Sequence, residues 1–167
     1  STVYRVPWLF DEEDEKNGVA LVPGQTAVDV VREFTKLKLE LMPYVYQLGL
    51  QPHVNGTPVM RSMFVEFPDD PACRTLDRQY MFGPSMLVAP VFTYSGEVSY
   101  YLPDGVWTNW LTGEKAQGGW RKETHGYDSI PLWARDGSVI VTNPGETKPD
   151  RVYGENALVS VFVDDVE

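Results

Sequence analysis

The chain has 167 residues, of which 43% are hydrophobic and 13% aromatic, and its formal net charge is −10. This length can form a substantial core but not a complete (β/α)8 barrel, which takes about 250 residues. The negative charge argues against nucleic acid and anionic membrane surfaces as partners, because both would repel it, and it suits a neutral ligand.

The first 18 residues combine an alternating aromatic segment with an acidic run. Extended backbone over residues 1–10 would place four large side chains on one side: Tyr4, Val6, Trp8 and Phe10. Residues 11–18, DEEDEKNG, carry like charges beside an Asn-Gly pair, which predicts a solvated loop. We therefore expect an extended segment followed by a loop.

No cofactor and no metal site is predicted. The acidic run lacks the D-x-D-x-D-G spacing of a calcium loop. The single cysteine, Cys73, excludes an internal disulfide and a cysteine-based metal site. A catalytic role for Cys73 would need a neighbouring histidine, and His53 and His125 both lie in segments that read as loops.

The strongest helix signal spans residues 26–48. Thr26 and Asp29 fit an N-terminal cap, and Gly49 is a natural stop. Pro43 should kink the helix or restart it near its last turns. Apolar residues at helical spacing form one stripe, which indicates a surface helix covering something apolar: Ala27, Val30, Val31, Phe34, Leu37, Leu41 and Leu48.

Residues 58–68, PVMRSMFVEFP, are apolar on both alternating faces, which predicts a central parallel strand covered by helices. Glu66 would lie at the carboxyl end of this strand, the end that faces the active site in α/β barrels. Asp69, Asp70 and Pro71 should then open a short helix that runs towards Gly83.

After Gly83 the pattern changes to short apolar runs separated by Gly, Pro, Asn and Asp at intervals of about ten residues, which is typical of an antiparallel sandwich. The runs are MLVAPVF, EVSYYLP, VWTNWL, GGWRKE, IPLWAR, SVIVTN and, after a linker, ALVSVFV. The sequence therefore predicts a domain boundary near residue 83, with an α/β part over 1–83 and an all-β part over 84–167.

Several segments together resemble glycoside hydrolase family 31, the α-glucosidase and α-xylosidase family, and its bacterial-type α-xylosidase branch in particular. They occur in the family's order and span nearly the whole chain: YRVPW, LMPY, GTPVMRSMFVEFPDDPAC, LDRQYMFG, LVAPVF, YLPDGVWTNWLTGE and PLWARDGSVI. The resemblance implies that residues 1–83 are the last strand–helix units of a (β/α)8 catalytic barrel. Residues 84–167 would be the β-sandwich that packs beside it.

The resemblance also implies a retaining mechanism with two aspartates, a nucleophile and a general acid/base, whose carboxyl groups lie about 5 to 5.5 Å apart. The family places both on earlier barrel strands, so no catalytic residue is expected in this chain. Tyr4 and Trp8 would lie in the loop after strand seven, near the mouth of the cleft. They are the candidate substrate-binding residues, with packing as the alternative role.

The resemblance implies two kinds of partner: an oligosaccharide or glycoside substrate of the full-length enzyme, and the remaining barrel segments of the same protein, with a homo-oligomer also possible. Glu66 is assigned a structural role that ties the strand end to a neighbouring loop. Arg61 should pair with an acid elsewhere in the full barrel. Two alternatives stay open, a carbohydrate-binding sandwich and a purely structural β-module, both without catalysis.

Overall fold

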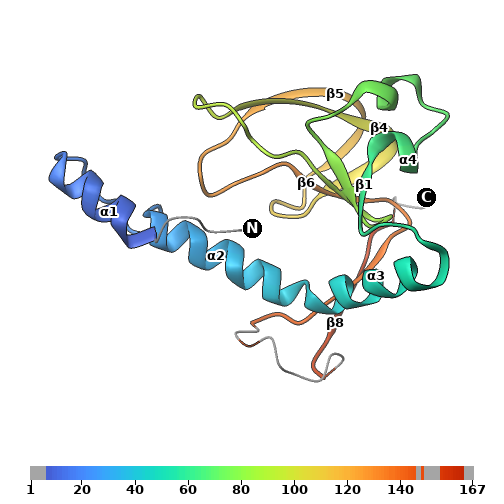
Figure 1. Ribbon diagram of the computed structural model, residues 1–167, viewed down its shortest axis with the longest axis horizontal. Coiled ribbons are helices and arrows are strands. Elements are labelled where there is room, and N and C mark those ends of the chain that lie inside the picture. The colour runs from blue at the N-terminus through green and yellow to red at the C-terminus, as the bar shows by residue number, and fades with distance from the viewer. Residues whose placement is uncertain (1–6, 146–147, 149–154, 164–167) are drawn as a thin grey trace.

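The computed structural model describes residues 7–145, 148 and 155–163. The chain forms a helical part, a six-stranded sheet in the order β1-β2-β3-β6-β4-β5, and a two-stranded sheet, β7-β8. Figure 1 shows α1, α2 and α3 following one another along one side of the molecule, with the large sheet on the other side. None of the described helices is long and apolar enough to cross a membrane. The elements are α1 (Pro7–Lys16), α2 (Ala27–Glu40), α3 (Met42–Asn55), β1 (Met60–Ser62), α4 (Met63–Glu66), a 3-10 helix (Pro71–Thr75), β2 (Tyr80–Phe82), β3 (Met86–Val88), β4 (Glu97–Asn109), β5 (Lys115–Thr124), β6 (Leu132–Arg135), β7 (Val139–Thr142) and β8 (Leu158–Val161).

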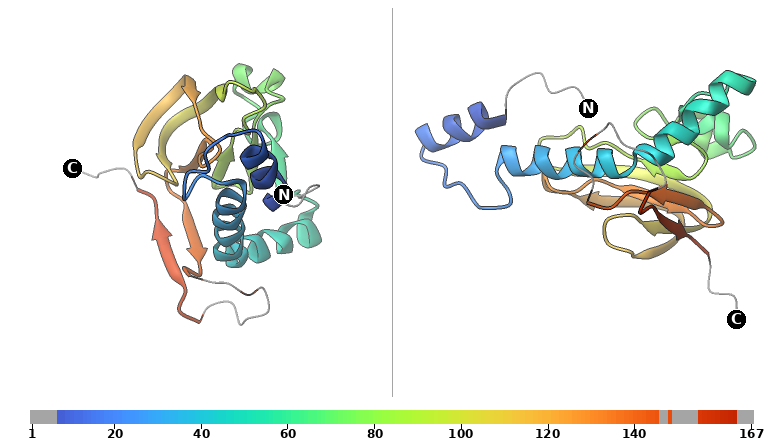
Figure 2. Two further views of the ribbon diagram at one scale, coloured as in Figure 1. Left: turned by 90° about the vertical axis from the view of Figure 1, so that its left-hand side faces the viewer. Right: turned by 90° about the horizontal axis from the view of Figure 1, so that it is seen from below.

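The acidic run near the start of the chain is helical, so the predicted extended segment and loop are wrong over α1. Pro7 occupies the first position of this helix, where its missing N–H costs nothing, and the glutamates that follow are good helix formers. The Asp11 carboxylate accepts hydrogen bonds from the backbone N–H groups of Ala27 and Val28, at 2.7 and 3.2 Å. This contact fixes α1 to the N-terminal end of α2. Figure 2 shows α1 lying at that end of α2.

The predicted helix from residue 26 is present, as two helices. Thr26 caps α2 by accepting a hydrogen bond from the Asp29 N–H at 3.1 Å, which confirms the predicted cap. The chain breaks at Leu41 and restarts with Pro43 in the first turn of α3, as the proline predicts. Gly49 does not end the helix, which runs on to Gly56, where φ is +75°. A left-handed glycine, rather than glycine as such, stops this helix.

The prediction of a long parallel strand over 58–68 is wrong. Only β1 is extended, it pairs antiparallel with β2, and it forms an edge of the large sheet. The chain then turns into α4, which buries Met63 completely. The apolar residues on both faces of this segment therefore reflect a change from strand to helix.

The predicted helix from residue 71 towards Gly83 is a single 3-10 turn followed by β2. Asp70 caps that turn by accepting a hydrogen bond from the Ala72 N–H at 2.9 Å. β2 and β3 pair across Gly83, so one sheet contains strands from both sides of the predicted boundary.

The antiparallel pattern predicted beyond residue 84 is confirmed, with one merger of strands. EVSYYLP and VWTNWL form a single strand, β4, whose register with β5 shifts between Leu102 and Val106. The Pro103 carbonyl inside this bulge accepts a hydrogen bond from the indole N–H of Trp107 at 2.8 Å. The Pro-Asp-Gly sequence therefore marks a bulge here and not a turn.

The core consists of two clusters on opposite faces of β3, because successive residues of a strand point to opposite faces. Leu87 joins a cluster built around Trp107 and Trp133. Met86 joins the other cluster, which α3 covers with Tyr44 and Leu48. All six side chains are at most 3% exposed, so both faces of the sheet are covered at this strand.

Gly83 lies in the β2–β3 turn, where that turn contacts Tyr44 and Leu48 of α3. Its φ is +63°, and a Cβ atom there would lie 2.4 Å from Leu48 Cδ2 and 2.6 Å from the Tyr44 hydroxyl. That hydroxyl is already fixed by a 2.7 Å hydrogen bond to the Phe82 carbonyl. We expect Gly83→Ala to lower the free energy of unfolding by about 2–3 kcal/mol, measured in urea.

Gly113 supplies the matched control, because its φ is also positive, at +76°, and nothing lies within 4 Å of the position of its Cβ atom. Gly113→Ala should cost only the conformational part, about 1 kcal/mol. Equal losses in the two variants would contradict the close contact between Gly83 and α3.

Candidate functional site

The two residues that the sequence assigns to sugar contact fall at the start of the chain. Tyr4 lies outside the described residues. Trp8 lies in the first turn of α1 with 57% of its surface exposed. The substrate-binding role of both residues stays a prediction.

A buried ion pair joins Arg61 on β1 to Glu66 at the end of α4. The two charged groups are 2.7 Å apart, and their side chains are only 7% and 15% exposed. Arg61 also donates hydrogen bonds to the Pro58 carbonyl oxygen and to the side-chain oxygen of Gln51 on α3. The expectation that Arg61 pairs with an acid elsewhere in the barrel is therefore wrong, because Glu66 supplies the carboxylate.

Glu66 also faces a second arginine. Its other carboxylate oxygen lies 3.6 Å from Nη1 of Arg135 on β6. The guanidinium of Arg135 stacks over the Phe67 ring at 4.9 Å. These contacts agree with the structural role predicted for Glu66. The carboxylate stands between two arginines and joins β1 to β6 through them.

A hollow of about 540 Å³ lies beside this ion pair. Its lining comes from segment 66–71, from Tyr101, Pro103 and Asp104 on β4, and from Arg135. The hollow therefore combines aromatic rings and prolines with carboxylates and one guanidinium group, and small-molecule sites commonly join apolar lining with a few polar groups in this way.

Tyr101 is held in place through its backbone. The buried side-chain amide of Gln79 donates a hydrogen bond to the Tyr101 carbonyl at 2.7 Å and accepts one from the Tyr101 N–H at 2.8 Å. The amide therefore makes the two backbone hydrogen bonds that a neighbouring strand would otherwise make with Tyr101. Burial of the Tyr101 hydroxyl, together with a hydrogen bond to Asp70, raises its pKa.

An exposed tryptophan stands next to Tyr101. Trp120 on β5 is directly opposite Tyr101 in the strand register, and the two ring centroids lie 5.4 Å apart. Trp120 is 65% exposed, so this Tyr101–Trp120 pair presents a broad aromatic surface beside the hollow. We expect such a surface to bind a partner or ligand with an apolar face.

Tyr101, Trp120 and Arg135 are not among the site residues predicted from the sequence. The alternation in EVSYYLP carries a usable signal, since it puts Tyr100 and Tyr101 on opposite faces of one strand. The pairing with Trp120 and the position of Arg135 depend on the strand order, which no local pattern contains.

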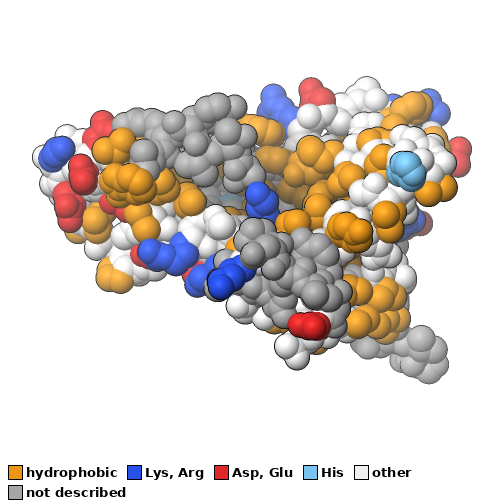
Figure 3. All heavy atoms as spheres, turned by 60° about the horizontal axis from the view of Figure 1, so that its bottom comes forward, with side chains coloured by type: hydrophobic (Ala, Val, Ile, Leu, Met, Phe, Trp, Pro, Cys, Tyr) orange, Lys and Arg blue, Asp and Glu red, His pale blue; other side chains and the backbone are white. Residues whose placement is uncertain are grey.

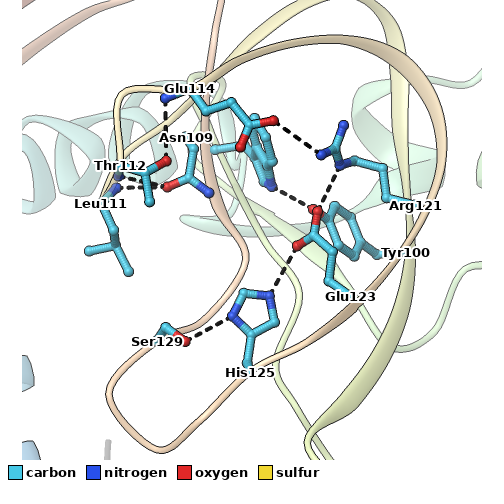
Figure 4. Close-up of polar contacts among 10 residues, drawn as sticks. Tyr100, Asn109, Leu111, Thr112, Glu114, Arg121, Glu123, His125 and Ser129 are labelled. Carbon is cyan, nitrogen blue, oxygen red and sulfur yellow. Dashed lines mark hydrogen bonds and ion pairs between the residues drawn. The ribbon is translucent and has the colours of Figure 1, made fainter.

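A second polar cluster lies on the other face of β4 and β5. Figure 4 shows Tyr100, Arg121 and His125 converging on the carboxylate of Glu123. Arg121 Nε lies 2.8 Å and His125 Nε2 lies 3.0 Å from the oxygens of Glu123. The cluster extends to Ser129, which His125 Nδ1 contacts at 3.0 Å, and so ties the loop after β5 to the sheet.

This environment changes the pKa values of its members. Burial alone would raise the pKa of Glu123, but hydrogen bonds from Arg121, His125 and Tyr100 outweigh it, and the net result is a pKa below the ordinary value of 4.5. Burial and the neighbouring Glu123 raise the pKa of Tyr100. The ionised carboxylate therefore stabilises the fold at neutral pH.

The remaining candidates for chemistry are accounted for by packing. Cys73 is buried, and burial raises the pKa of its thiol to about 11, so it is a poor nucleophile at neutral pH. In the described part of the chain, no group of three or more His, Cys, Asp or Glu side chains could hold a metal ion.

Removing Glu66 should be costly because it leaves Arg61 buried without its carboxylate. We expect Glu66→Ala to lower the free energy of unfolding by about 3 kcal/mol, measured by urea denaturation. The control is Glu97→Ala, which removes a surface ion pair with Lys122 whose members are 51% and 65% exposed. That variant should lose about 0.5 kcal/mol, and similar losses in both would exclude a special role for the Glu66 pair.

Glu123 should make stability depend on pH in the acid range. Its pKa is lower in the folded chain, so its contribution is present above pH 4.5 and is lost as pH falls through the folded value. We expect Glu123→Gln to be less stable than the parent at pH 7 and to lose less stability on acidification. Thermal unfolding between pH 3 and pH 7 measures this, and parallel pH profiles for the two proteins would contradict it.

Comparison with known proteins places this chain among glycoside hydrolases. Residues 56–140 match the model of the glycosyl hydrolase family 31 C-terminal domain. An α-xylosidase from Emericella nidulans is 41% identical over 90% of the chain, and the α-xylosidase XylQ from Lactiplantibacillus pentosus is 38% identical over 98% of it. The chain spans about a fifth of the length of these relatives, 19% and 20% respectively.

Solved structures agree with the sequence relatives. A family 31 dextranase from Flavobacterium johnsoniae in complex with isomaltotriose has a TM-score of 0.76 and 28% identity, over 84% of this chain and 18% of that one. A family 31 α-xylosidase from Xanthomonas citri has a TM-score of 0.67 and 31% identity, over 77% of this chain and 14% of that one. The family match, the relatives and the shared fold together show that this chain belongs to glycosyl hydrolase family 31 and carries its C-terminal domain.

Proposed function

We propose that this chain is the C-terminal part of a retaining α-glycosidase that hydrolyses α-linked xylose at the non-reducing end of its substrate. The observation that carries the proposal is the similarity to two α-xylosidases, at 41% and 38% identity over 90% and 98% of the chain. Other relatives include α-glucosidases, such as one from Saccharolobus solfataricus at 35% identity over 77% of the chain. Glucose is therefore the second candidate glycone.

The reaction needs parts that this chain does not supply. Retention requires one carboxylate to attack the anomeric carbon and a carboxylic acid to protonate the leaving oxygen, about 5 to 5.5 Å apart. The glycosyl–enzyme ester is then hydrolysed by water, with the second group acting as base. We assign both aspartates to the part of the parent enzyme outside this chain, and Tyr4 and Trp8 to the mouth of its cleft.

The proposed role of this chain is to complete and support the catalytic barrel. Residues 1–83 would close the barrel and residues 84–167 would form the β-domain beside it, with β1 and β2 joining the two parts across residue 83. An apolar stripe on α3 fits a docking role, because Tyr46, Leu50 and Val54 are spaced four residues apart and are 54–81% exposed. Figure 3 shows hydrophobic side chains gathered on the side of the molecule where α3 lies.

An activity assay on the full-length enzyme tests the proposal. We expect it to hydrolyse an aryl α-xyloside with a kcat/KM at least about tenfold above that for the matching aryl α-glucoside. The 167-residue chain alone should give no turnover on either substrate, since we assign the carboxylate pair to the rest of the enzyme. The β-anomer of the aryl xyloside is the control for the stereochemistry of cleavage.

Each other result has a definite meaning. A preference for the glucoside would replace xylose by glucose in the proposal. Failure of the full-length enzyme to cleave either α-glycoside would overturn the hydrolase proposal and favour a carbohydrate-binding or structural module. Turnover by the isolated chain would overturn the assignment of the aspartates.

A further inference from the structure

We propose that the hollow between segment 66–71 and β4 binds a neutral pyranose sugar, with the Tyr101–Trp120 pair as its stacking surface. This site lies within the described residues and would act in binding, independently of the carboxylates that perform hydrolysis. The choice of a sugar rests on the proposed function, while the shape and chemistry of the site come from the side chains themselves.

The size of the hollow suits one or two sugar rings. Its volume is about 540 Å³, within the range of about 300 to 1,000 Å³ that is usual for small-molecule sites. It is an open hollow between segment 66–71 and β4, so a sugar bound there would stay partly exposed to solvent. This geometry favours part of a longer chain over a fully enclosed ligand.

The aromatic pair provides an apolar surface at the margin of the hollow, where Tyr101 is part of the lining and Trp120 packs against Tyr101 outside it. Trp120 is 65% exposed, so its apolar ring stays in contact with water unless a ligand covers it. One face of a pyranose ring carries mainly C–H groups, and such a face packs against an aromatic ring. The two rings are 5.4 Å apart with an interplanar angle of 50°, so they form a shallow angled platform.

The polar groups of the hollow match hydroxyl groups rather than charges. Within the described residues, no salt bridge engages Asp69 or Asp104, so both carboxylates can accept hydrogen bonds from sugar hydroxyls. Arg135, 42% exposed in its side chain, can donate to a ring or hydroxyl oxygen. An excess of carboxylates over guanidinium groups disfavours acidic sugars and phosphorylated ligands.

The walls of the hollow are held in place before a ligand arrives. The Gln79 amide fixes Tyr101 through two backbone hydrogen bonds, at 2.7 and 2.8 Å. Asp70 caps the 3-10 turn at 2.9 Å, and Arg135 lies between Glu66 and the Phe67 ring. Little conformational entropy is lost on binding to such a site, which helps a ligand that offers few contacts.

A titration of the 167-residue chain with isomaltotriose tests the inference. The chain contains five tryptophans, whose indole N–H signals can be followed by NMR in labelled protein. We expect a saturable shift of the Trp120 signal, identified by its loss in Trp120→Phe. The signal of Trp110, whose ring packs against Phe162 in the cluster on the other face of the sheet, should stay in place and serves as the internal control.

Variants then locate the binding site. Trp120→Ala should weaken binding by about fivefold or more, Trp120→Phe should retain most of it, and Asp104→Asn should weaken it. Tyr94→Ala removes a fully exposed aromatic ring elsewhere and should leave the affinity unchanged. The remaining indole signals report whether each variant keeps its fold. A dianionic disaccharide of galacturonic acid should not bind.

Three results would overturn the inference: no saturable shift, equal affinities for the Trp120→Ala and Tyr94→Ala variants, or equal binding of the uronic acid disaccharide. These results are separate from the hydrolysis assay. Loss of hydrolysis with sugar binding intact would overturn the proposed function alone, and hydrolysis without binding at Trp120 would overturn this inference alone.

Discussion

The buried ion pair between Arg61 and Glu66 is the contact on which the arrangement around the hollow depends. Arg61 reaches three separate pieces of chain: Gln51 on α3, the Pro58 carbonyl before β1, and Glu66 at the end of α4. Glu66 in turn faces Arg135 on β6. A charge buried at this depth is tolerated only when its partners are fixed. The pair therefore sets how α3, the edge of the sheet and segment 66–71 lie relative to one another.

The large sheet provides a rigid surface on which segment 66–71 lies. Its central strands are packed on both faces, with Trp107 and Trp133 on one side and α3 on the other. The bulge in β4 lies next to the hollow and turns the strand where Pro103 and Asp104 line it. Bulges of this kind redirect side chains without disrupting the rest of a sheet. Together with Gln79, the bulge fixes the position of Tyr101, which is half-buried at the edge of the hollow.

The sequence predicts those features of the fold that depend on neighbouring residues. The Thr26 cap, the break at Pro43 and the antiparallel strands all follow from local patterns, and the structure confirms them. The errors occur where two local readings compete. The acidic run at 11–18 fits a loop by charge and a helix by propensity, and contact of Asp11 with the start of α2 favours the helix. In residues 58–68, the apolar pattern does not distinguish one buried strand from a short strand followed by a helical turn.

The candidate site was harder to predict because its residues are brought together by strand order. Tyr101 and Trp120 are 19 positions apart and meet only through the register of β4 and β5. Arg135 reaches Glu66 through the position of β6 between β3 and β4.

Two exposed surfaces of the molecule differ in their chemistry. The stripe of Tyr46, Leu50 and Val54 on α3 is an exposed apolar surface that suits protein. The hollow combines aromatic rings with carboxylates and suits a hydroxylated ligand. A domain that served only to support the barrel would need the first surface and would gain nothing from exposing Trp120, which is why the second surface calls for a ligand.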